Sequence, residues 1–117
     1  MPDEPQPTPT LLILCRDLLL GSKITSAAQS AGVAYRVVRD AAKLNGLQGE
    51  RLIVDLNQDG ALDAAADWKR TGGREVVGFV SHVDSDTIRR ARAAGLDQVL
   101  PRSQFVSQLA SILRAVS

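Results

Sequence analysis

Short apolar runs, separated by segments of helical period, constrain this chain more than any other feature of it. Four of them are Leu11–Cys15, Leu52–Leu56, Val76–Val80 and the weaker Gln98–Leu100, and a fifth is Tyr35–Val38, flanked by Arg39. Runs this apolar, with little alternation of polar residues, are typical of strands covered on both faces, as in a parallel sheet. The sequence therefore predicts a sheet buried between two layers of helices.

The segments between the runs carry apolar residues at helical spacing. This spacing extends from Ile24 to Ala31, from Leu62 to Trp68, from Ile88 to Ala94 and from Phe105 to Val116. Gly32 and Gly95 can end two of these helices, and Asp84 and Ser103 can cap two of them. The segment 40–47 is the weakest predicted helix, because it is short and closed by glycines. Strand and helix alternate five times, which predicts right-handed βαβ units in a doubly wound α/β sheet.

The first ten residues differ in composition from the rest of the chain. They hold four of the five prolines together with Asp3 and Glu4, which predicts a mobile, extended tail (residues 1–10) before a single domain (residues 11–117). The run after the tail lacks a basic leader and is too short to span a bilayer. One cysteine excludes an internal disulfide and fits a reducing cytoplasm. The net charge of +1 favours neither nucleic acid nor a membrane as a partner.

Candidate functional residues are the polar ones that end the predicted strands. In doubly wound sheets, ligands bind beyond the carboxyl ends of the strands. The residues at these ends are Cys15, Arg16, Asp17, Asp55, Asn57, Ser81, His82 and Arg102. His82 is the only histidine, and a loop contact is the simpler interpretation of it than a catalytic or metal-binding role.

The stretch VVGFVSHVDSDTIRRARAAGLDQVLPRSQF resembles the fourth strand, fourth helix and fifth strand of response-regulator receiver domains, the CheY-like superfamily. Ser81, the pair Ala94-Gly95 and Arg102 stand where that family carries Ser or Thr, Ala-Gly and Lys. In RLIVDLN, Asp55 stands where the family's phosphorylated aspartate stands. The resemblance covers residues 10–117 and implies a flavodoxin-like (βα)5 fold with three layers (α/β/α) and strand order 2-1-3-4-5.

The first strand departs from the receiver pattern at its end. Receivers that accept phosphate carry an acidic pair there, which holds Mg²⁺ together with the phosphorylated aspartate. Counted back from Gly32, those two slots hold Cys15 and Arg16, and Asp17 comes one position late. A thiol and a guanidinium cannot replace carboxylates around Mg²⁺. The resemblance therefore implies a degenerate pseudo-receiver, that is, a receiver-like domain with no metal site and no cofactor.

Two further departures occur near the fifth strand. Arg102 replaces the lysine of the family, and Val99 stands where many receivers carry a switching Tyr or Phe. An arginine is a planar fork suited to a carboxylate. We therefore hypothesise that Arg16 or Arg102 pairs with Asp55 and holds the domain in one state.

The leading functional interpretation is a stand-alone signalling module that binds a protein partner without phosphorylation, is not an enzyme, and is cytoplasmic and monomeric or weakly dimeric. The resemblance implies that the partner face is made by the fourth predicted helix, the fifth strand and the fifth helix, with Arg89, Arg90, Arg92 and Val99. A first alternative is a phosphoacceptor of a two-component phosphorelay with Asp55 as acceptor, in which Asp17 reaches back to complete an Mg²⁺ site. A second is a small-molecule-binding flavodoxin-like domain, which the missing glycine-rich phosphate loop disfavours.

Two apolar features near the first strand have competing interpretations. Cys15 is most simply a small core residue, although a neighbouring cation such as Arg16 can also activate a thiol. The turn Leu18–Leu20 is expected to pack over the end of the sheet, and the alternative is an exposed binding patch.

Overall fold

The computed structural model describes residues 11–72, 75–81 and 84–114. Its five strands are parallel and lie in the order β2-β1-β3-β4-β5. The strands are β1 (Leu11–Leu14), β2 (Tyr35–Val38), β3 (Arg51–Asp55), β4 (Glu75–Val80) and β5 (Gln98–Pro101). This topology confirms the predicted doubly wound, flavodoxin-like sheet and its strand order.

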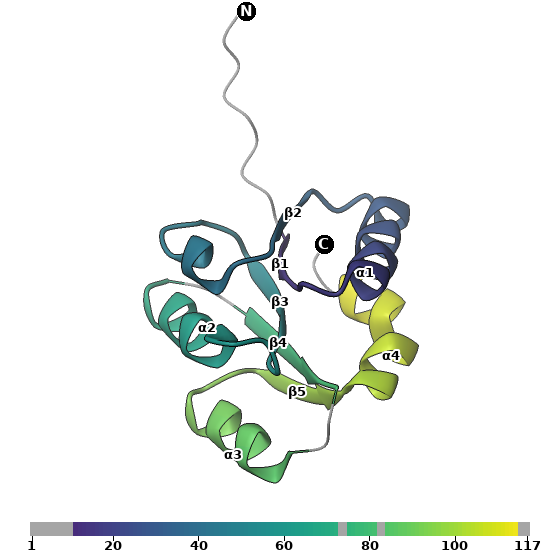
Figure 1. Cartoon of the computed structure of the whole chain (residues 1–117). Coiled ribbons are helices and arrows are strands. Elements are labelled where there is room, and N and C mark those ends of the chain that lie inside the picture. The colour runs from purple at the N-terminus through teal and green to yellow at the C-terminus, as the bar shows by residue number, and fades with distance from the viewer. Residues whose placement is uncertain (1–10, 73–74, 82–83, 115–117) are drawn as a thin grey trace, which may run out of the picture.

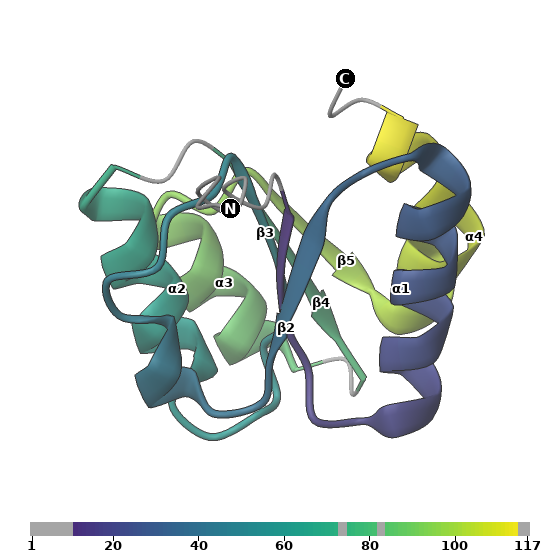
Figure 2. The ribbon, with the colours of Figure 1, turned by 90° about the horizontal axis from the view of Figure 1, so that it is seen from above.

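Helices cover both faces of the sheet (Figures 1 and 2). They are α1 (Leu18–Ala31), the 3-10 helix η1 (Ala41–Leu44), α2 (Ala61–Arg70), α3 (Ser85–Ala93) and α4 (Arg102–Arg114). The helices α1 and α4 lie on one face, and η1, α2 and α3 lie on the other, which confirms the three layers. None of the helices in the described ranges is long and apolar enough to cross a membrane.

Alternation along each strand divides the core in two, because successive side chains of a strand point to opposite faces. Leu11, Ile13 and Phe79 pack under α1 and α4, whereas Leu12 and Leu14 pack under α2 and α3. All five are fully buried. A strand buried on both faces needs apolar residues at every position, which is why the sequence shows runs rather than alternation.

Gly78 interrupts the apolar run of β4 for a packing reason. A Cβ atom at this position would lie 2.5 Å from Cδ1 of Leu56 and 2.9 Å from its Cγ. Leu56 is buried in the core under α2 and α3. The glycine therefore makes room for the leucine that follows the neighbouring strand.

The weakest predicted helix is in fact a single 3-10 turn. Asp40 caps it by accepting a hydrogen bond from the Ala42 N–H at 3.0 Å, and Leu44 alone is fully buried. The following loop is held by the Trp68 indole N–H, which donates to the Leu47 carbonyl at 2.9 Å. Gly46 has φ 83°, which ends the turn after a few residues because few other residues adopt this conformation.

Two predicted helix starts are wrong. The structure begins α1 at Leu18 rather than near Ile24, so Leu18–Leu20 form the first turn of a helix and not a loop. Leu20 is buried, but Leu18 and Leu19 are 63% and 78% exposed, so the expectation that all three pack over the sheet is wrong for two of them. In α4, Ser103 lies inside the first turn, because the helix begins directly after β5. The predicted cap at Asp84 is present, where its carboxylate accepts from the Asp86 N–H.

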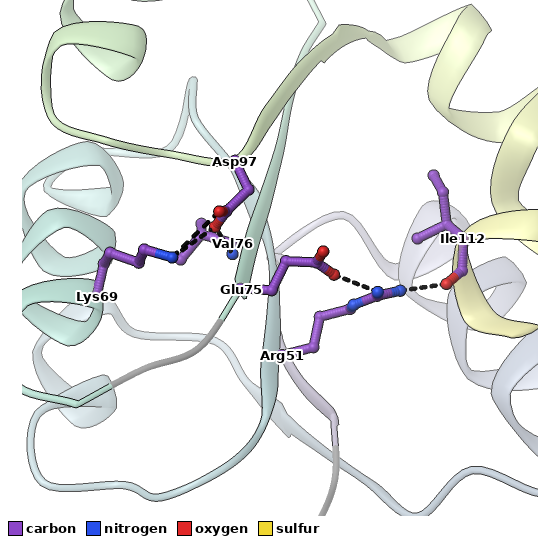
Figure 3. A network of polar contacts seen from close by, with 6 residues as sticks. All are labelled: Arg51, Lys69, Glu75, Val76, Asp97 and Ile112. Carbon is purple, nitrogen blue, oxygen red and sulfur yellow. Dashed lines mark hydrogen bonds and ion pairs between the residues drawn. The ribbon is translucent and has the colours of Figure 1, made fainter. Parts of the chain in front are cut away.

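A polar network joins the elements at the amino-terminal edge of the sheet (Figure 3). Arg51, which is only 7% exposed, pairs with the carboxylate of Glu75 and donates to the Ile112 carbonyl of α4. Burial alone would raise the pKa of Asp97, but hydrogen bonds from Lys69 Nζ and the Val76 N–H hold that pKa below its ordinary value. The network therefore ties β3, β4, α2 and α4 together by charged groups.

Candidate functional site

The carboxyl edge of the sheet brings three charged side chains together. Asp17 follows β1, Asp55 ends β3 and Arg102 follows β5. Arg102 Nη2 lies 3.3 Å from Asp17 Oδ2. Both residues begin helices of the same layer, since Asp17 caps α1 and Arg102 is the first residue of α4. The pairing of Arg102 with Asp17 thus links the starts of the two helices on one face.

Both oxygens of the Asp17 carboxylate have partners. Its Oδ1 accepts hydrogen bonds from the backbone N–H groups of Leu19 at 3.0 Å and Leu20 at 3.2 Å, while Oδ2 faces Arg102. An aspartate at this position satisfies N–H groups that have no partner inside the helix. Asp17 is therefore the N-cap of α1 and the partner of Arg102 at once.

The hypothesis that Arg16 or Arg102 pairs with Asp55 is wrong. Arg102 pairs with Asp17, and Arg16 is exposed and forms no ion pair within the described ranges. Arg16 turns outward because Cys15, its neighbour, is 3% exposed and points into the core under α1 and α4. Burial raises the pKa of the Cys15 thiol, which disfavours the thiolate.

Asp55 lies half-buried between these groups. Burial raises the pKa of its carboxyl group, the Asn57 N–H and the positive charge of Arg102 oppose that rise, and the negative charge of Asp17 adds to it. Oδ1 of Asp55 accepts from the Asn57 N–H at 3.0 Å. The folded state therefore favours the protonated form of Asp55 more than water does.

Asn57 and Ser81 connect the loops that follow β3 and β4. The Ser81 N–H donates to Oδ1 of Asn57, whose own N–H donates to Asp55. Ser81 is exposed at the edge of the site. His82, the next residue of the predicted site, lies outside the described residues.

The site does not fit the Mg²⁺ ion that active receivers hold. Within residues 11–72, 75–81 and 84–114, no three or more His, Cys, Asp or Glu side chains are grouped so that they could hold a metal ion. The end of β1 supplies a buried thiol, an exposed guanidinium and a carboxylate that already binds two N–H groups and an arginine. Mg²⁺ needs oxygen ligands free to enter an octahedral shell.

The four residues of the predicted partner face lie in different surroundings. Arg89 pairs with Asp86 one turn earlier in α3, and Arg92 is exposed. Arg90 lines a hollow between α3 and the β3–α2 loop together with acidic residues. Val99 of β5 is half-buried against the core under α2 and α3. Arg102, which begins the following helix α4, is directed to Asp17.

Sequence reasoning missed a groove of about 480 Å³ along the free side of β2. Its walls are the start of α1, the strand itself and the η1 segment. The residues that line the groove include Leu18, Arg36, Val37, Arg39, Lys43 and Leu47. The one signal in the sequence was Arg36, a charge inside the apolar run Tyr35–Val38, which marks a strand with an exposed side.

Replacing Asp55 with asparagine is expected to raise the free energy of unfolding at neutral pH. A carboxyl whose pKa is raised by folding contributes stability below its unfolded pKa, and that contribution is lost as the pH rises through the folded pKa. Asparagine keeps an oxygen for the Asn57 N–H without the desolvated charge. The gain should disappear at pH values below the ordinary aspartate range, where Asp55 itself is protonated.

Urea unfolding of both proteins at the two pH values measures this effect. Asp59→Asn is the matched control, because it removes the same charge from an exposed side chain of the next loop. A variant at position 55 that is less stable than the wild type at neutral pH would contradict the prediction.

Comparison with known proteins gives relatives by structure only. No protein-family model and no curated protein matches the sequence. A response regulator from Thermotoga maritima superimposes with a TM-score of 0.74 and 15% identity, over 93% of this chain and 97% of that one. An orphan response regulator of H. pylori gives 0.77 and 16%, over 96% and 98% of the two chains. A CheY-like receiver domain protein from Methanospirillum hungatei gives 0.74 and 11%, over 91% and 94%. The chain therefore has the flavodoxin-like, CheY-like fold of response-regulator receiver domains.

Proposed function

We propose that this chain is a receiver-like signalling module that acts by binding a protein partner, without phosphorylation of Asp55 and without catalysis. The observation that carries the proposal is the engagement of Asp17 by α1 and by Arg102. Asp17 is the carboxylate nearest in sequence to the position where an Mg²⁺-binding pair would be needed. It serves the helix instead of a metal.

Releasing Asp17 for a metal would have a structural cost. The N-cap hydrogen bonds of a helix are worth about 1 kcal/mol. The partly exposed ion pair with Arg102 adds to this, by about 0.5 kcal/mol at such sites. These effects together support a domain that does not use the phosphorylation chemistry of active receivers.

The fold supports a role in signalling by contact. Each of the three structural relatives above carries a name that makes it a response regulator or a receiver domain. The present chain keeps their scaffold with an altered site at the carboxyl edge of the sheet. A scaffold kept without the metal pair fits a binding function better than a phosphoryl-transfer one.

Intact mass after incubation with acetyl phosphate and Mg²⁺ tests this proposal. We expect no mass gain in the wild type, and the Asp55→Ala variant serves as the control for the acceptor position. A receiver that accepts phosphate, treated in parallel, reports that the reagent is active. A gain of one phosphoryl group in the wild type that Asp55→Ala abolishes would overturn the proposal in favour of a phosphoacceptor.

A further inference from the structure

Strand β2 has a free edge. It pairs with β1 on one side and is the terminal strand of the sheet. The Ala34 carbonyl accepts from the Leu11 N–H at 3.0 Å, and the Val38 carbonyl accepts from the Cys15 N–H at 3.3 Å. Because bonding direction alternates along a strand, Tyr35 and Val37 direct their N–H and C=O groups away from β1. Figure 2, seen from above, shows β2 at the near edge of the sheet.

The groove beside this edge is partly apolar. Val37 and Leu18 of α1 line the groove, and they are 38% and 63% exposed. Leu47 lines it on the η1 side. Exposed leucine and valine beside unpaired backbone groups are the features that an added strand would cover.

The charge of the groove is positive. Arg36, Arg39 and Lys43 line it, are exposed and form no ion pair with an acidic side chain in the described part of the chain. The acid among the lining residues is Asp17, whose carboxylate faces Arg102. Carboxylates of a ligand would therefore meet three unneutralised cations.

We propose that the free edge of β2 binds an extended, acidic segment of a partner protein, which adds as a further strand of the sheet. The inference rests on the proposed function in one respect, that the chain acts by binding a protein. Backbone hydrogen bonds to Tyr35 and Val37 supply affinity, and the groove selects the side chains. A second copy of the chain is disfavoured as the occupant, because pairing β2 with β2 would bring two sets of these cations together.

The pleat of the strand specifies the side chains of the partner. Directly opposite residues of two paired strands share a face. The residue opposite Val37 therefore lies on the α1 side, near Leu18, and should be apolar. Val38 packs in the core on the η1 side, and Arg36 shares its face of the strand. The partner residues that flank the apolar one lie on this face and should be acidic. The segment is expected to alternate apolar and acidic residues.

Fluorescence anisotropy with a labelled peptide of Glu-Val repeats tests this inference. The wild type is expected to bind it, and to bind a Lys-Val repeat roughly tenfold more weakly or not at all, because like charges would then meet across the groove. Added salt should weaken the binding of the acidic peptide. Failure of the Glu-Val peptide to bind, or equal binding of the two peptides, would overturn the inference.

Two variants locate the binding. Val37→Pro removes an N–H that points away from β1, so no hydrogen bond of the sheet is lost, and edge strands tolerate proline at such positions. This variant is expected to abolish binding. Arg36→Glu is expected to weaken binding roughly tenfold. Lys23→Glu makes the same charge change on an exposed part of α1 outside the groove and should leave binding unchanged. Thermal melts followed by circular dichroism confirm that each variant is folded.

One further result would identify a second copy of the chain as the occupant of the β2 edge, and another separates this inference from the proposed function. A concentration-dependent dimer in sedimentation that Val37→Pro abolishes would show a second copy at the edge and overturn the inference. Asp55→Ala should retain peptide binding, since the carboxyl edge takes no part in it. Phosphorylation of Asp55 would thus overturn the phosphate-free function and leave the peptide result standing, whereas loss of peptide binding alone would overturn only the inference about β2.

Discussion

Phe105→Ala is expected to lower the free energy of unfolding by about 4 kcal/mol, the largest effect of any substitution considered for this protein. The rings of Phe79 and Phe105 stack with their centroids 4.6 Å apart, and both side chains are fully buried. The pair joins β4 to α4. Truncation removes the transfer free energy of the ring and leaves a cavity that the rigid sheet cannot close.

Urea unfolding followed by far-UV circular dichroism measures the loss. Gln108→Ala is the matched control, because this side chain is exposed on the same helix. Its effect should stay within about 0.5 kcal/mol. A loss at Phe105 below about 1.5 kcal/mol would mean that α4 packs on the sheet less tightly than the stacked rings indicate.

Arg51→Ala is expected to lower the free energy of unfolding by about 3 kcal/mol. The substitution leaves the Glu75 carboxylate and the Ile112 carbonyl without their donor at the amino-terminal edge of the sheet (Figure 3). The Arg51 side chain is 9% exposed and that of Glu75 is 33% exposed, so water relieves part of the penalty on the glutamate. The expected effect is therefore at the lower end of the range for broken buried pairs.

A second ion pair provides the control. Arg70 and Asp67 pair one turn apart on α2, with side chains 72% and 63% exposed. Arg70→Ala should change the free energy of unfolding by about 0.5 kcal/mol or less, because water screens an exposed pair. Equal losses for the two substitutions in the same urea experiment would show that Arg51 behaves as a surface charge.

The predicted core is confirmed by the structure wherever the apolar pattern was long. The runs that begin at Leu11, Leu52 and Val76 became three buried strands, with bounds that differ from the prediction by one residue at some ends. Helix starts were less predictable. The first turn of α1 is defined by the Asp17 cap and not by apolar spacing, so a prediction from spacing began it too late. The segment 40–47 had a helical composition but too few residues between Asp40 and Gly46 for more than a 3-10 turn.

The location of the candidate site could be predicted from the sequence, but the contacts between its side chains could not. The rule that ligands bind at the carboxyl ends of parallel strands pointed to Asp17, Asp55 and Arg102, and the structure brings these three together. Which acid Arg102 would choose depends on where α1 and α4 begin. Asp17 caps the start of α1 and α4 begins directly after β5, and the packing of both helices on the same face of the sheet brings these two starts together.

By itself, the sequence determined the class of the fold, because a strand buried on both faces and a helix buried on one impose different apolar periods on the chain. It also determined that the end of β1 lacks the two acids that an Mg²⁺ site requires, since residue type alone decides which ligands exist. Only the tertiary structure decided the partner of Arg102, the outward turn of Arg16 and the groove along β2. These features join residues far apart in the chain, and their distances follow from how helices pack across the sheet, which no local pattern encodes.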